Sequence, residues 1–121
     1  MASALVIEDN RQMADSLCQM LDLLGVKARP AYGPRAAILS MSERVPDVIF
    51  TDINLPGVNG FEIIAYLRRL PQLAQVPIVI VTSDDQPETA RRAREIGAQD
   101  LLIKPVSFEM LEKVLSDLKL S

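Results

Sequence analysis

The chain has 121 residues, of which 49% are hydrophobic and 24% are charged, and its net charge is −3. This length fits one domain with its own core, spanning residues 1–121, and the slight acidic excess argues against nucleic acid as its partner. The absence of histidine excludes histidine-based metal sites and triads, and the single cysteine, Cys18, excludes an intrachain disulfide. No apolar run is long enough to span a bilayer and the first ten residues lack a basic signal region, so we expect a cytoplasmic protein without a membrane partner.

Short apolar runs alternate with longer amphipathic stretches along the whole chain. The expected strands are Ala4–Ile7, Val26–Ala31, Asp47–Phe50, Ile78–Thr82 and Leu101–Ile103. The expected helices are Arg11–Leu24, Pro34–Glu43, Gly60–Arg69, Pro87–Ile96 and Phe108–Leu118. Three of the runs are apolar without alternation, which is typical of parallel strands covered on both faces, whereas Val26–Ala31 is more polar and indicates an edge strand.

Capping signals mark the start of three of the expected helices. The segments Asp9–Gln12, Asn59–Glu62 and Asp85–Glu88 each have the spacing of a capping box. Five repeats of strand and helix predict an α/β fold, a doubly wound sheet of five parallel strands with helices on both faces, and the strand order we consider for it is 2-1-3-4-5. In such a fold the functional site lies outside the carboxyl ends of the strands, next to the point where the strand order reverses.

The expected strand ends carry the residues of a possible site. Strand one is followed by Glu8 and Asp9, strand three by Asp52, strand four ends in Thr82 and strand five is followed by Lys104. In the order 2-1-3-4-5 strands one and three are neighbours, so three carboxylates would share one pocket with a lysine. Like charges this close disfavour one another, and a divalent cation with oxygen ligands, Mg²⁺ above all, would relieve that repulsion.

Each of these residues also has a simpler interpretation when it is taken alone. Asp9 could be only a helix cap and Asp52 a turn residue. Thr82 could be an ordinary β-branched strand residue, and Lys104 a solvated charge. The four strand ends together favour a site, because acids, hydroxyl and lysine all fall at the same edge of the expected sheet.

Four sequence motifs contain these residues: VIEDN, TDINLPGVNG, IVIVTS and GAQDLLIKP. With them, essentially the whole chain resembles the receiver domain of two-component response regulators, and in particular the chemotaxis regulators. The resemblance implies a flavodoxin-like fold of five strand–helix repeats.

The resemblance also implies a role for each acidic residue. Asp52 would be the phosphoacceptor. Asp9 would bind Mg²⁺ directly and Glu8 through a water molecule, and the main-chain carbonyl of Asn54 would be a further ligand beside Asp52.

The same resemblance assigns the phosphoryl contacts. Thr82 would hydrogen-bond the phosphoryl group, Lys104 would pair with it, and the peptide bond before Pro105 would be cis. The family usually has tyrosine or phenylalanine after the acidic residue of strand five, as a ring that moves with the threonine. This chain has Leu101 at that position, so no aromatic switch is expected.

The function implied is a phosphorylation-activated signalling module. Its donor would be a histidine kinase or phosphotransfer protein, and its output a downstream protein target or a fused output domain. The module would catalyse only its own phosphorylation and dephosphorylation. The face of helix four, strand five and helix five would serve for output or for a homodimer. Met13 and Met20 on the first helix fit either filling at the core edge or a kinase contact.

The residues bear on three competing functions. An aspartate-nucleophile phosphatase carries a second aspartate two residues after the nucleophile, where this chain has Asn54. A flavin mononucleotide binder needs a phosphate loop after strand one, where this chain has the acidic stretch EDNRQ. A degenerate receiver that acts as a constitutive scaffold is compatible with Leu101, but the acids, hydroxyl and lysine of the site are all present.

Overall fold

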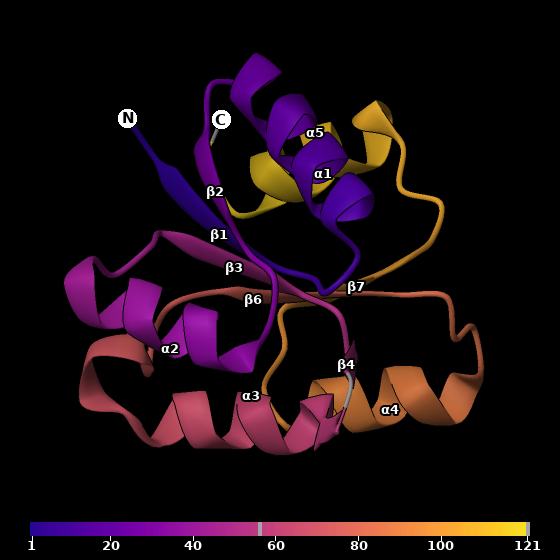
Figure 1. Ribbon diagram of the computed structural model, residues 1–121. Helices are drawn as coiled ribbons and strands as arrows, with labels where there is room; N and C mark the ends of the chain where they lie inside the picture. Colours follow the sequence, from indigo (N-terminus) through magenta and orange to yellow (C-terminus); the bar gives the residue numbers. More distant parts are fainter. Residues whose placement is uncertain (56, 121) are drawn as a thin grey trace.

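A computed structural model describes residues 1–55 and 57–120 and contains one parallel five-stranded sheet (Figure 1). Its strands are β1 (Ser3–Ile7), β2 (Lys27–Ala31), β3 (Val48–Thr51), β6 (Ile78–Thr82) and β7 (Asp100–Ile103). They lie in the order β2-β1-β3-β6-β7. Counted along the chain, this is the predicted order 2-1-3-4-5, so the predicted fold is confirmed.

Within the described residues, five α-helices and one short 3₁₀ helix cover the sheet. They are α1 (Arg11–Leu23), α2 (Pro34–Glu43), α3 (Gly60–Arg69), η1 (Pro71–Leu73), α4 (Pro87–Glu95) and α5 (Phe108–Asp117). Figure 1 shows α1 and α5 on one face and α2, α3 and α4 on the other. No predicted strand or helix end differs from the observed one by more than one residue. Among the helices of the described residues, none has the length and apolar character needed to cross a membrane.

The central strands are buried on both faces because each contributes side chains to two cores. In β1, Ala4 and Val6 belong to the core under α1 and α5, whereas Leu5 and Ile7 belong to the core under α2, α3 and α4. β3 and β6 alternate in the same way. A strand with helices on both sides has no polar face, which explains the unbroken apolar runs in the sequence.

A two-stranded hairpin follows Asp52, between the expected strand Asp47–Phe50 and the expected helix Gly60–Arg69, where no strand was predicted. The strands β4 (Asn54–Leu55) and β5 (Val58–Asn59) pair antiparallel. Two-residue strands are too short to leave a periodic signal. Gly57 has a φ of +71°, a left-handed conformation that glycine adopts readily in turns, and Pro56 lies outside the described residues.

Two of the three predicted capping boxes are wrong by one residue. The N-cap of α1 is Asn10, whose side chain accepts a hydrogen bond from the Met13 amide at 3.0 Å. Asp9 therefore does not cap the helix. α4 begins after Gln86 instead of after Asp85. Asn59 does cap α3, as predicted, through the Phe61 amide at 2.9 Å.

Gly60 brings the start of α3 into contact with the segment that follows Asp52. Its amide donates to the Ile53 carbonyl at 3.1 Å. A Cβ atom on Gly60 would lie 2.3 Å from Ile53 Cα, closer than real side-chain atoms approach. Glycine is therefore required here for the hairpin and α3 to hold Asp52 in place.

β2 forms one edge of the sheet, as predicted. Lys27 donates its amide to the carbonyl of Ala2, toward β1, so the amide of Ala28 and the nitrogen of Pro30 face outward. The Ala28 amide donates to Asp22 Oδ1 at 3.0 Å. The outer side of β2 is thus occupied by a side chain of α1 and by a proline.

Candidate functional site

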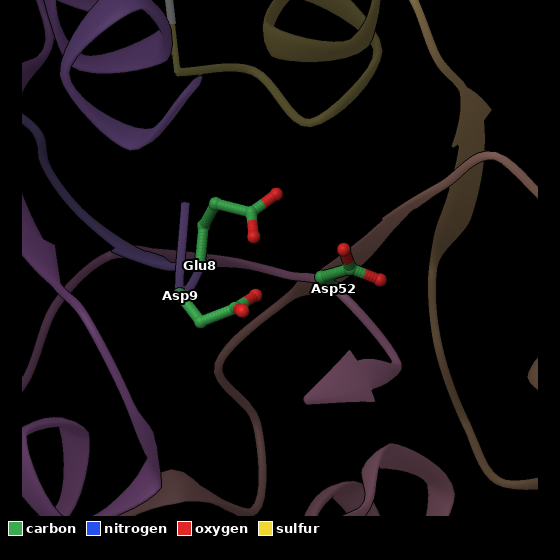
Figure 2. Close-up of side chains that lie close together, drawn as sticks. All are labelled: Glu8, Asp9 and Asp52. Atoms are coloured by element: carbon green, nitrogen blue, oxygen red, sulfur yellow. The ribbon is translucent and has the colours of Figure 1, made fainter. Parts of the chain in front are cut away.

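Three carboxylates converge at the carboxyl edge of the sheet. Glu8 and Asp9 follow β1, and Asp52 follows the neighbouring β3 (Figure 2). One oxygen from each lies within 4.8 Å of the other two. Glu8 and Asp52 are buried, and Asp9 is exposed. The strand order alone brings them together, since β1 and β3 run side by side and end at the same level.

Lys104 lies between two of these acids. Its Nζ donates to Glu8 Oε1 and to Asp52 Oδ2, both at 2.7 Å. Burial by itself lowers the pKa of Lys104, but the hydrogen bonds to Asp52 and Glu8 outweigh it and raise the pKa, so the ammonium stays charged. Burial raises the pKa of Glu8, and its bond to Lys104 offsets this only in part. The bond from Lys104 to Pro105 is cis, as expected.

Thr82 lies buried at the end of β6 and is tied to Asp52 through Asn54. The Asn54 amide nitrogen of the main chain donates to Asp52 Oδ1 at 2.9 Å, and its side-chain Nδ2 donates to Thr82 Oγ1 at 3.3 Å. Thr82 Oγ1 also accepts from the Asp84 amide at 3.2 Å. With two bonds accepted, the remaining capacity of this hydroxyl is to donate its own proton. The side-chain role of Asn54 was not predicted, since only its carbonyl was singled out.

Asp84 and Thr89 were missed by the sequence reasoning. Asp84 Oδ1 accepts from the Gln86 amide at 3.0 Å, and Oδ2 accepts from Thr89 Oγ1 at 2.6 Å. Both hydrogen bonds lower the pKa of Asp84, and the bond from Thr89 has the larger effect. The spacing of Asp84 to Gln86 is that of an Asx turn and was the available signal, but the capping-box spacing pointed to Asp85 instead.

The rim of the site on the α1 side is apolar. A groove of about 300 Å³ is lined by α1 residues, including Met13 and Met20, and by Pro105 and Val106. Met13 is exposed, and its sulfur lies 4.0 Å from Lys104 Nζ. Met20 packs against the core. Met13 therefore lies on the surface and Met20 at the core edge, and a kinase contact through these residues stays a prediction.

The acidic pocket suits a hard divalent cation. Its donors are carboxylate oxygens, which Mg²⁺ and Ca²⁺ prefer, and three of them can reach one point. Two of the three are already bonded to Lys104, so an ion here would share the acids with a fixed ammonium.

Comparisons of the sequence identify relatives along most of its length. The model of the response regulator receiver domain family matches residues 4–116. Protein PilH of Pseudomonas aeruginosa is 31% identical over 116 residues, which cover 96% of each chain. The phosphate regulon transcriptional regulatory protein PhoB of Escherichia coli is 32% identical over 103 residues, covering 85% of this chain but 45% of PhoB.

Solved structures agree with this assignment. Chemotaxis protein CheY4 of Vibrio cholerae superposes with a TM-score of 0.91 at 29% identity, covering 98% of each chain. The signal receiver domain of a DNA binding response regulator from Colwellia psychrerythraea also gives 0.91, at 30% identity over 100% of each chain. Neither a phosphatase nor a flavin-binding assignment is favoured. The chain therefore belongs to the receiver domains of two-component response regulators.

Proposed function

We propose that Asp52 accepts a phosphoryl group and that this modification switches a protein-interaction surface of the domain. The proposal rests on one observation, which is that each carboxylate oxygen of Asp52 is held by a hydrogen bond. Oδ1 accepts from the Asn54 amide and Oδ2 from Lys104, within a cluster of three carboxylates. A nucleophilic carboxylate held in one orientation beside a cation suits phosphoryl transfer, which depends on positioning and on charge stabilisation.

The transfer step uses only groups that meet at this edge of the sheet. An Asp52 oxygen forms a bond to phosphorus, and the bond from phosphorus to the donor breaks, with its electron pair leaving on the donor atom. The donor atom is the imidazole nitrogen of a phosphohistidine, or an acetate oxygen when acetyl phosphate is used. Lys104 would pair with the transferred oxygens, and the Thr82 hydroxyl would donate its proton to one of them.

Glu8, Asp9 and Asp52 would hold Mg²⁺, together with the main-chain carbonyl of Asn54. When bound, the ion supplies positive charge to the phosphoryl oxygens. The chain's own contribution is to bring the acids together, and to keep Asp9 free for this role by capping α1 with Asn10.

The expected partners follow from the family. Receiver domains work with histidine kinases and output domains, and we propose a histidine kinase or phosphotransfer protein as donor for this chain. The face of α4, β7 and α5 would contact a downstream protein, a fused output domain or a second copy. Loss of the phosphoryl group by hydrolysis would return the domain to its resting state. The cytoplasmic location and the absence of a nucleic acid partner stay predictions.

Phosphorylation in vitro tests the proposal. The purified chain is incubated with acetyl phosphate and Mg²⁺, and its intact mass is measured. We expect the addition of one phosphoryl group, and we expect EDTA or the substitution Asp52→Asn to abolish it. Asp100→Asn is the matched control. Asp100 is exposed at the amino end of β7, away from the sheet edge that carries Asp52, so this substitution should leave the modification unchanged.

An unmodified wild-type chain, under conditions that modify a known receiver domain, would refute the proposal. That result would favour the degenerate receiver, a scaffold that works without phosphorylation. Modification of Asp52→Asn to the wild-type extent would place the phosphoryl group on another residue and would equally contradict the role of Asp52.

A further inference from the structure

A short chain of hydrogen bonds runs from the site to the first turn of α4. Thr82 Oγ1 accepts from the Asp84 amide at 3.2 Å. The carboxylate of the same Asp84 accepts from Thr89 Oγ1 at 2.6 Å and from the Gln86 amide at 3.0 Å. Asp84 therefore bonds the site through its main chain and α4 through its side chain. Thr89 is buried and lies in the first turn of that helix.

Few buried side chains hold this end of α4, and its guanidinium contact with α3 places Arg92 4.2 Å from the centroid of the Phe61 ring. Two of its nine residues are buried, Thr89 and Ala93, whereas the ten-residue α3 buries four. A cleft of about 560 Å³ lies beside the first turn, with Asp84, Thr89 and Arg92 on one side and residues of the hairpin and α3 on the other. A helix with little buried apolar surface next to open space depends for its position on its hydrogen bonds and on contacts such as that of Arg92.

The opposite end of α4 is fixed more firmly. The guanidinium of Arg68, on α3, donates to the Gly97 carbonyl at 2.9 Å and to Gln99 Oε1 at 2.8 Å. It also donates to the carbonyls of Leu73 and Val76 at 3.1 and 2.6 Å. Arg68 thus links the segment after α3 to the segment after α4, and this anchors the carboxyl end of α4. A displacement of the helix would therefore be largest at its first turn.

We propose that the hydrogen bond between Thr89 and Asp84 transmits the state of Asp52 to α4. The inference rests on the proposed phosphorylation of Asp52. An oxyanion created there is a new acceptor for the Thr82 proton. If the Thr82 hydroxyl rotates or moves toward the oxyanion, its hydrogen bond from the Asp84 amide changes. Because the Asp84 carboxylate accepts a bond from Thr89, a shift of Asp84 also shifts the first turn of α4.

Leu101 does not offer the same connection. Its side chain is half-buried and packs against the core under α2, α3 and α4. A leucine side chain has no polar atom, so it can fill space vacated by Thr82 but cannot follow a hydroxyl through a directional bond. The Asp84–Thr89 bond is directional, and it ends on the helix that borders the proposed output face.

Two substitutions of Thr89 separate the bond from the packing. Thr89→Val removes the hydroxyl and keeps the branched shape, whereas Thr89→Ser keeps the hydroxyl and removes a methyl group. Each full-length chain is incubated with acetyl phosphate and Mg²⁺. Intact mass gives the phosphorylated fraction, and hydrogen–deuterium exchange of peptides covering residues 84–96 gives the response of α4 at that fraction.

We expect phosphorylation to change the exchange rate of α4 by about fivefold in wild type and in Thr89→Ser, the low end of the range for coupled sites. In Thr89→Val the phosphorylated fraction should stay at the wild-type level, but phosphorylation should leave the exchange rate of α4 almost unchanged. Asp84→Ala is the second variant should Thr89→Val fold poorly. It keeps the main-chain amide that donates to Thr82 but removes the carboxylate that accepts from Thr89, so it should show the same loss of the exchange response.

The inference is overturned if Thr89→Val and Asp84→Ala respond to phosphorylation as wild type does. It is also overturned if wild type gains the phosphoryl group without any change in α4. A wild-type chain that gains no phosphoryl group refutes the proposed function instead, so the two failures are distinguishable by the intact mass.

Discussion

Replacing Lys104 by methionine tests the electrostatics of the site most directly. The substitution removes the ammonium that lies 2.7 Å from both Glu8 Oε1 and Asp52 Oδ2 and keeps a long side chain. These carboxylates are only 4% and 7% exposed, so they would be left buried without a cation. Breaking a buried ion pair costs about 3–5 kcal/mol, and the 14% exposure of Lys104 places our expectation at about 3 kcal/mol.

Urea unfolding at neutral pH in EDTA measures this loss. With a slope of about 1.5 kcal/mol per molar, the midpoint should fall by about 2 M. Lys113→Met is the matched control, because Lys113 pairs with Asp117 at 3.0 Å but the two side chains are 79% and 56% exposed. That exposed pair should contribute at most about 0.5 kcal/mol.

The pH dependence gives a second check on the same variant. The pKa of Glu8 is already raised by burial, and loss of Lys104 should raise it further. A group whose pKa is raised on folding favours the native state at low pH and loses that contribution as the pH rises through its folded pKa. The defect of Lys104→Met should therefore shrink toward about pH 5. Equal unfolding midpoints for Lys104→Met and Lys113→Met would refute this reasoning.

Three further predictions follow from the packing and the hydrogen bonds. Gly60→Ala should lower the free energy of unfolding by about 1–3 kcal/mol, because its Cβ would overlap Ile53, and thermal unfolding checks this. Burial raises the pKa of Cys18 from 9.0 to about 11, so stability should fall as the pH rises between these values, and a thiol reagent at neutral pH should label the urea-unfolded chain far faster than the native one. Arg68→Gln should cost about 2 kcal/mol in urea unfolding, while the exposed neighbour Arg69→Gln should cost about 0.5 kcal/mol or less.

The sheet could be predicted because its central strands are covered on both faces. Runs such as Ile78–Thr82 leave no polar face, and the amphipathic stretches between them fit only helices. The number of strands and the placement of helices on both faces therefore followed from alternation and connection rules. Helix starts were less predictable. At α1 the neighbours Asp9 and Asn10 could both cap the helix, and Asn10 does so. At α4 Asp85 has the spacing of a cap, but the helix begins after Gln86, which makes no side-chain cap bond.

The site was predictable where it depends on topology and not where it depends on side-chain orientation. Glu8, Asp9, Asp52 and Lys104 meet because strand ends meet, which the strand order already implies. The bond from Asn54 Nδ2 to Thr82 depends on the hairpin after Asp52, whose short strands leave no pattern.

The two edges of the sheet differ in their capacity to recruit another strand. Along β2, which lies wholly within the described residues, the outward amide of Ala28 is occupied by Asp22, and Pro30 has no amide hydrogen. An incoming strand would find no donor there, so this edge resists sheet extension between molecules. Of the two edges of the five-stranded sheet, the β7 edge is therefore the one left for strand-to-strand association, and it lies beside the helix that responds to Asp52 in our proposal.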